Sequence, residues 1–208
     1  MTNGSKFTGV IGLLVIGLFA SSCSGEKKNE ANAKSGGAML DMPAKQAADK
    51  PGTSASAAGI QWKVPASWAQ GPEKPMRAAT YMIGTGAEQA ECAVFYFGNG
   101  QGGDVQANIG RWIGQVKQPD GSSSEGKAKK SEVKSACCSI STIEVAGTYL
   151  ASAGPMMQVK EEKPGYELIG GIAPAPEGNV FFKLTGPQKT VEKIREEFLG
   201  MLKSVSKS

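Results

Sequence analysis

The side chains that could do chemistry form a restricted set, because this chain of 208 residues contains no histidine. Its absence excludes Ser-His-Asp and Cys-His catalysis, His-ligated zinc and haem held by a proximal histidine. Cysteine, tyrosine, lysine and the carboxylates remain. None of them falls into the spacing of a known catalytic or metal site, so we expect no enzyme activity, no cofactor and no bound metal.

One glycine-rich segment, Gly98 to Gly103, matches the G-x-G-x-x-G pattern of dinucleotide-binding loops. Its context argues against a nucleotide. Asp104 stands at the start of the next predicted helix, where its charge would repel a pyrophosphate and would instead cap free N–H groups. The following segment, Lys127 to Lys134, is charged, whereas the nucleotide fold needs an apolar parallel strand there. We interpret the glycine-rich segment as a flexible loop or a tight crossover.

Three cysteines of the predicted body, Cys92, Cys137 and Cys138, are candidates for a disulfide. The first interpretation is that they are buried small apolar side chains, or that Cys92 bonds to one of the other two. A vicinal disulfide or a reactive thiol is the alternative. Adjacent residues on a strand point to opposite faces, so Cys137 and Cys138 can share a pocket only at a bend. Three thiols without histidine make a poor zinc shell.

A polar stripe of Asn108, Arg111 and Gln115 follows one side of the predicted central helix, next to Trp112. Such a stripe is typical of a solvated helix face. The functional alternative is an interaction surface on which Arg111 anchors a carboxylate.

The elements that must position these residues follow from the period of the apolar side chains. Strands are predicted at residues 60–64, 77–83, 91–97, 127–134, 139–150, 166–173 and 179–184. One helix is predicted from Val105 to Val116, and a closing helix is predicted after Pro187. Strands joined by turns, with one internal and one final helix, favour an α+β fold whose mainly antiparallel sheet is flanked by helices.

The first 22 residues read as a signal peptide, with Lys6 before an apolar run from Val10 to Phe19. The sequence Ala20-Ser21-Ser22-Cys23 resembles the lipobox of bacterial lipoproteins. That resemblance implies cleavage before Cys23 and lipidation of its thiol, and the uncharged Ser24 then implies the outer membrane. The alternative is an ordinary cleaved signal with an incidental cysteine. Residues 23–59 predict a disordered tether, because they are rich in Ala, Gly, Ser and Lys and poor in large apolar residues.

Residues 60–208 are predicted to form a single domain. The pattern Trp62-x-Val64-Pro65-x-x-Trp68 and the segment Phe181 to Pro187 resemble small secreted domains with the PsbP-like α/β/α sandwich. That family includes extrinsic subunits of photosystem II and accessory or binding proteins, so the resemblance implies a fold more than a function.

A net charge of +4, with acidic and basic residues interleaved, gives no reason to expect nucleic acid as a partner. The sequence therefore predicts a non-enzymatic lipoprotein of the cell envelope, anchored in the outer membrane and facing the periplasm or the cell surface. Its body would bind or scaffold a protein or a small envelope ligand. The alternative is a secreted, histidine-independent enzyme using cysteine or carboxylate chemistry, which would need a deep pocket where such groups converge.

Overall fold

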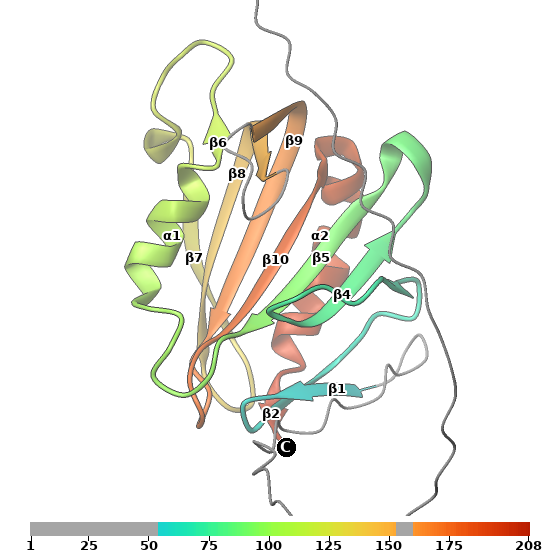
Figure 1. The fold of residues 1–208 in the computed structure, drawn as a ribbon, viewed down its shortest axis with the longest axis vertical. Helices are drawn as coiled ribbons and strands as arrows, with labels where there is room; N and C mark the ends of the chain where they lie inside the picture. The colour runs from blue at the N-terminus through green and yellow to red at the C-terminus, as the bar shows by residue number, and fades with distance from the viewer. Residues whose placement is uncertain (1–53, 153–159) are drawn as a thin grey trace, which may run out of the picture. The chain divides into compact units, whose positions relative to one another are not determined.

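A computed structural model of the chain describes residues 54–152 and 160–208. An eight-stranded antiparallel sheet forms the centre of these residues, with helix α1 on one face and helix α2 on the other (Figure 1). This confirms the predicted α+β class, a mainly antiparallel sheet flanked by helices. We call the face that carries α1 the front face and the face that carries α2 the back face.

The strand order in the main sheet is β3-β4-β5-β10-β9-β8-β6, and β7 pairs with β8. The strands are β3 (Ala69–Gln70), β4 (Arg77–Ile83), β5 (Ala90–Tyr96), β6 (Val116–Lys117), β7 (Lys129–Lys134), β8 (Ser139–Ser152), β9 (Lys160–Ala173) and β10 (Val180–Pro187). The helices are α1 (Val105–Ile113) and α2 (Gln188–Lys203), with short 3₁₀ turns η1 (Gly86–Glu88) and η2 (Ser124–Gly126).

The alternation of side chains on the strands divides the core into two clusters. On β10, Phe181 packs in the front cluster with Ile109 and Trp112 of α1, whereas Phe182 packs in the back cluster with Phe198 of α2. Each helix thus covers its own apolar face of a sheet that is buried on both sides.

Two adjacent glycines of β9 let both helices approach the sheet closely. A Cβ atom at Gly170 would lie 2.2 Å from the ring of Trp112, and one at Gly171 would lie 2.8 Å from Leu202. Neighbouring strand residues face opposite sides, so this pair of glycines makes room for one helix side chain on each face.

Helix α1 begins where the sequence predicts it and ends earlier. Asp104 is the N-cap, and its side chain accepts a hydrogen bond from the Ala107 N–H at 2.9 Å. Gly114 is the C-cap, so Val116, which was assigned to the apolar helix face, lies instead in β6 and pairs with Tyr149. The prediction for Val116 is wrong because the 3.6-residue period continues by coincidence beyond the glycine that ends the helix.

The predicted boundary of the domain at residue 60 is also too late. Strand β1 (Ser54–Ala57) pairs with β2 (Ile60–Lys63), and β2 pairs with β11 (Ser206–Lys207), forming a separate three-stranded sheet. Strand β1 consists of Ser and Ala, which have little β-propensity, so its sequence does not predict a strand. Its pairing with β2 determines its structure. The signal peptide, Cys23 and residues 24–53 of the predicted tether lie outside the described residues. Within residues 54–152 and 160–208, no helix has the length and hydropathy needed to span a bilayer.

Candidate functional site

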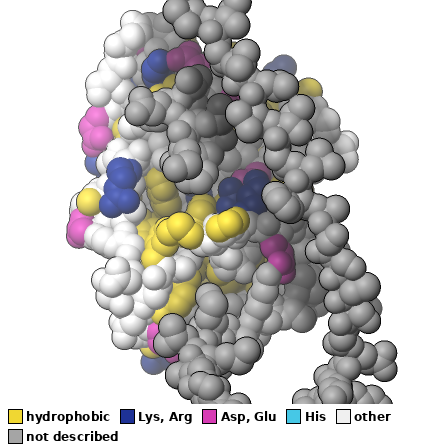
Figure 2. All heavy atoms as spheres, in the orientation of Figure 1, with side chains coloured by type: hydrophobic (Ala, Val, Ile, Leu, Met, Phe, Trp, Pro, Cys, Tyr) yellow, Lys and Arg dark blue, Asp and Glu magenta, His cyan; other side chains and the backbone are white. Residues whose placement is uncertain are grey.

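The front face of the sheet carries two adjoining hollows beside α1. The first, which we call the aromatic pocket, has a volume of about 180 Å³ and is lined by Phe95, Phe97, Asn108, Arg111, Trp112, Gln115, Phe181 and Lys183. The second, the outer hollow, has a volume of about 370 Å³ and is lined by Met76, Phe97, Gln101, Gly102, Gly103 and Arg111. Hydrophobic side chains gather across the middle of this face, with basic side chains on either side of them (Figure 2). Phe97 and Arg111 line both hollows and so join them into one region.

Aromatic rings form the apolar wall of the aromatic pocket. Phe97 stacks on Phe95 with ring centres 6.0 Å apart and meets Phe181 edge-on at 5.5 Å. Trp112 of α1 meets Phe181 from the other side at 6.4 Å. Phe97 remains 37% exposed although its neighbours are well packed. An exposed ring at the end of an aromatic row is a surface on which an apolar ligand can stack.

Lys183 lies on the wall of the pocket, in the middle of β10. Its Nζ donates hydrogen bonds to Gln115 Oε1 and to Tyr149 Oη, the second at 2.9 Å, and it lies 5.1 Å from the centre of the Tyr149 ring. Burial lowers the pKa of Lys183 to about 8, the positive charge of Arg77 adds to this effect, and Glu91 opposes it. Both groups that accept hydrogen bonds from the ammonium are neutral, because one is a side-chain amide and the other is a phenol.

Tyr149 stays a neutral phenol at physiological pH. Burial raises its pKa to about 12, and the negative charge of Glu91 contributes in the same direction. Its ring stacks on that of Tyr166 at 6.4 Å. Tyr149 can therefore orient the ammonium of Lys183 but does not neutralise its charge.

Glu91, the carboxylate whose charge acts on both Lys183 and Tyr149, is already paired with other cations. Its two oxygens lie 2.9 Å from Arg77 Nη1 and 2.7 Å from Lys74 Nζ. Burial raises the pKa of Glu91, but the hydrogen bond from Lys74 and the charges of Arg77 and Lys74 outweigh it, so the net shift is downward. With Lys74, Arg77 and Lys183 set against Glu91, this cluster on the front face has an excess of positive charge.

The structure places all three residues of the predicted polar stripe on the wall of the aromatic pocket. Arg111 is exposed, and Gln115 is half-buried and accepts from Lys183. Asn108 is not solvated, because it is 6% exposed and its Nδ2 donates to the carbonyls of Gly102 and Asp104, both at 2.8 Å. The interpretation of the stripe as a solvated helix face is therefore wrong for Asn108, which fastens the glycine-rich loop to α1.

Sequence reasoning missed Lys183, Tyr149 and Phe97. A usable signal was present for Lys183, since it is the only charged residue in the apolar run Val180 to Leu184. A single cation within a buried strand has to find partners on the protein or on a ligand. Tyr149 and Phe97 gave no comparable signal, because their places beside Lys183 and Phe181 depend on long-range strand pairing.

The glycine-rich segment connects β5 to α1 without forming a nucleotide site of the dinucleotide type. The neighbours of β5 are β4 and β10, and both run antiparallel to it, whereas that fold requires parallel strands. A Cβ atom at Gly102 would lie 2.8 Å from the Phe181 ring, so this glycine allows the loop to rest on the aromatic wall. The interpretation as a tight connection agrees with this geometry.

The cysteines of the body are all free thiols in the structure. Cys92 is fully buried in the back cluster, and burial raises its pKa far above the ordinary range. Cys137 and Cys138 lie side by side in the turn between β7 and β8, the bend that the sequence required for them to share one site. Among the residues that the structure describes, no group of three or more Cys, Asp or Glu is arranged to hold a metal ion.

No known protein family matches the sequence, and no curated protein matches it either. Solved structures that match include that of cyanobacterial PsbP (CyanoP) from Synechocystis sp. PCC 6803. It shares 9% sequence identity, covers 73% of this chain and 88% of its own, and superposes with a TM-score of 0.43. Similarity at this level transfers neither a family nor a function.

Proposed function

We propose that the body is a non-enzymatic binding module and that the aromatic pocket takes a small amphiphilic anion, such as an aromatic or aliphatic carboxylate. The observation that carries the proposal is the position of Lys183, a half-buried cation with neutral hydrogen-bond acceptors beside an aromatic wall. A carboxylate would supply the negative charge that Gln115 and Tyr149 do not, and the rings would cover the apolar part of the ligand.

The size and the charge of the site restrict the ligand. A space of about 180 Å³ admits a ligand of one or two fused rings, with room to extend past Phe97 into the outer hollow. Arg111 lines both spaces and is placed to meet a second polar group of the same ligand. The positive excess on the front face favours anions over cations.

Calorimetric titration with two matched probes, naphthoate and the uncharged naphthamide, tests this proposal. We expect naphthoate to bind at least tenfold more tightly, which corresponds to about 1.4 kcal/mol. Lys183→Met should abolish that difference. The control is Lys193→Met, which removes an exposed charge from α2 on the back face and should leave the difference unchanged. Equal affinity of the wild-type protein for the two probes would contradict the proposal.

The pH dependence of binding gives a second test of the same site. The anion requires the protonated ammonium, and the pKa of Lys183 is lowered to about 8. Naphthoate affinity should therefore fall as the pH rises through about 8, whereas naphthamide affinity should stay constant. A naphthoate affinity that does not change between neutral and clearly alkaline pH would assign the charge recognition to Arg111 instead.

We further propose that the chain is a lipid-anchored protein of the cell envelope. The support is the lipobox-like sequence before Cys23 and the apolar run from Val10 to Phe19. Cys23→Ser in the full chain should move the protein from the membrane fraction to the soluble fraction. Retention in the membrane fraction would show that another segment anchors the chain.

A further inference from the structure

The turn between β7 and β8 brings two thiols into direct contact. The chain bends between Lys134 and Ser139, and the Sγ atoms of Cys137 and Cys138 lie 3.0 Å apart. Carbon atoms in ordinary contact lie about 3.5–4.0 Å apart, so these larger sulfur atoms are closer than simple packing requires. Both residues are half-buried at the edge of the back cluster and are therefore partly accessible from solvent.

Hydrogen bonds of the backbone hold the turn in this shape. The Ser135 N–H donates to the Cys138 carbonyl at 3.0 Å, and the Cys138 N–H donates to Ser135 Oγ at 3.2 Å. The Ala136 N–H donates to the Val205 carbonyl at 3.2 Å, which ties the turn to the segment after α2. The two sulfur atoms are therefore held together by the fold without any bond between them.

We propose that Cys137 and Cys138 form a reversible redox site, which exchanges with a disulfide in the surroundings to give a vicinal disulfide. One thiol loses its proton and attacks the external disulfide, forming a mixed disulfide and releasing the first thiolate. The second protein thiol then loses its proton and attacks the bonded protein sulfur, which releases the second thiolate. The protein loses two electrons and two protons, and the external disulfide becomes two thiols.

The geometry of neighbouring residues makes such a bond a reversible one. Consecutive Cα atoms are about 3.8 Å apart, whereas the Cα atoms of ordinary disulfides are about 4.4–6.8 Å apart. A bond outside that range is strained and more easily reduced. It also closes no loop of the chain, so it adds little to stability through the unfolded state. Its consequence is a change of covalent state in a turn whose Ala136 N–H bonds to the Val205 carbonyl.

Mass mapping of the full chain tests this site. The protein is incubated with oxidised glutathione, free thiols are alkylated, and the chain is cut with trypsin. Peptide 135–160 contains Cys137, Cys138 and no other cysteine, and Cys92 falls in the separate peptide 78–111. We expect peptide 135–160 to lose two hydrogen atoms, to carry no glutathione and to regain both thiols after dithiothreitol. Cys92 should be unmodified before the chain is unfolded.

The variant Cys138→Ser removes the second thiol and should leave a stable glutathione adduct on Cys137. Cys92→Ser should change nothing in peptide 135–160. Three outcomes for the wild-type protein would overturn the proposal: two stable glutathione adducts on peptide 135–160, a disulfide cross-link between that peptide and peptide 78–111, or two unchanged thiols after prolonged incubation with oxidised glutathione. None of these readouts depends on ligand binding at the aromatic pocket, so the two proposals can fail separately.

Discussion

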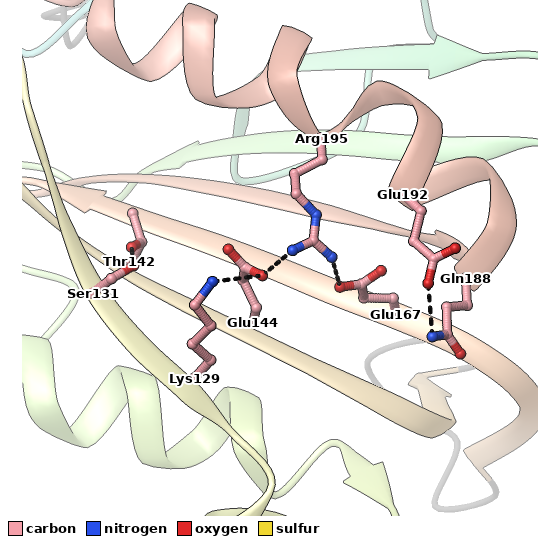
Figure 3. A network of polar contacts seen from close by, with 8 residues as sticks. All are labelled: Lys129, Ser131, Thr142, Glu144, Glu167, Gln188, Glu192 and Arg195. Carbon is pink, nitrogen blue, oxygen red and sulfur yellow. Dashed lines mark hydrogen bonds and ion pairs between the residues drawn. The ribbon is translucent and has the colours of Figure 1, made fainter.

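The two faces of the main sheet bury charge in different ways. On the back face, Arg195 of α2 bonds to Glu144 on β8 and to Glu167 on β9, at 2.5 Å and 2.7 Å (Figure 3). On the front face, the half-buried cation is Lys183, whose hydrogen-bond acceptors are the neutral Gln115 and Tyr149. The back face thus pairs its cation with carboxylates, whereas among the described residues no ion pair joins Lys183 to a carboxylate.

This difference separates the structural role of Arg195 from the binding role that we propose for Lys183. Arg195, Glu144 and Glu167, which we call the Arg195 cluster, fix the position of α2 over β8 and β9, since one guanidinium joins the helix to two strands. Lys183 contacts neutral groups and does not join a helix to the sheet by ion pairs. An anionic ligand could offset the free-energy cost of its desolvation. The two clusters also differ in composition. On the back face Arg195 and the exposed Lys129 face two carboxylates, whereas on the front face Lys74, Arg77 and Lys183 are set against Glu91.

The strongest test of the structural role is Arg195→Met. Arg195 is 28% exposed, and its partners Glu144 and Glu167 are 11% and 5% exposed. Removing the arginine leaves two carboxylates with little solvent, and the exposed Lys129, 4.0 Å from Glu144, compensates them only weakly. We expect the free energy of unfolding to fall by about 3–5 kcal/mol at neutral pH, measured by urea denaturation.

The matched control is Lys129→Met, which removes the other cation near Glu144. Lys129 is 69% exposed and lies 4.0 Å from the carboxylate, so its loss should cost less than about 0.5 kcal/mol. If both variants lost the same small amount, the Arg195 cluster would not be a structural joint, and the contrast between the two faces would disappear.

The same measurement on the front face should give the opposite sign. Lys183→Met replaces a desolvated ammonium by an apolar side chain of similar length, so we expect a gain of about 1–2 kcal/mol at neutral pH. The folded state disfavours the charged form of Lys183, whose pKa is lowered to about 8. The penalty is full below that pH and disappears as the pH rises toward the ordinary range of lysine.

The gain from Lys183→Met should therefore shrink in strongly alkaline solution. Urea denaturation at neutral pH and at alkaline pH checks this, with Lys193→Met as the exposed control that should change neither value. A variant that is less stable at neutral pH would mean that Lys183 holds the fold together, and the binding role would lose its main support.

The sequence predicted the elements well and the site only in part, for a physical reason. Strand β2 (Ile60–Lys63) and the N-cap Asp104 follow from local alternation and capping, so they could be read directly from the sequence. The aromatic pocket depends on pairing across the sheet: Phe181 lies opposite Phe95, and Lys183 lies opposite Ala93. Pairing between β5 and β10 joins segments far apart in the chain, and no local pattern specifies it.

The turn that carries Cys137 and Cys138 shows the same division. Adjacent cysteines are visible in the sequence, and the rule that neighbouring strand residues face opposite sides gave the condition under which they could meet. Whether the chain bends there is decided by Ser135 and by the contact of Ala136 with Val205. That contact depends on how the segment after α2 packs, and the sequence of the turn alone carries no information about it.

The smallest predicted effect compares two carboxylates on opposite faces, Glu91 and Glu167. The pKa of Glu91 is lowered, because Lys74 and Arg77 outweigh its burial. The pKa of Glu167 is raised, because burial and the charges of Glu144 and Glu192 outweigh Arg195, and its Oε2 is buried without a hydrogen bond in the described part of the chain. Glu91 therefore stabilises the fold at neutral pH and loses that contribution as the pH falls through its folded pKa. The contribution of Glu167 is full in acid and is lost as the pH rises through its folded pKa.

The variants Glu91→Gln and Glu167→Gln should consequently differ from the wild-type protein in opposite ways as the pH changes. Glu91→Gln should cost about 1 kcal/mol at neutral pH and almost nothing in acid. Glu167→Gln should become more favourable relative to the wild type as the pH rises, by about 1 kcal/mol between acid and neutral solution. Urea denaturation of the three proteins across this pH range measures both slopes. Slopes of the same sign would mean that the neighbours of Glu167 compensate its charge as well as Lys74 and Arg77 compensate Glu91.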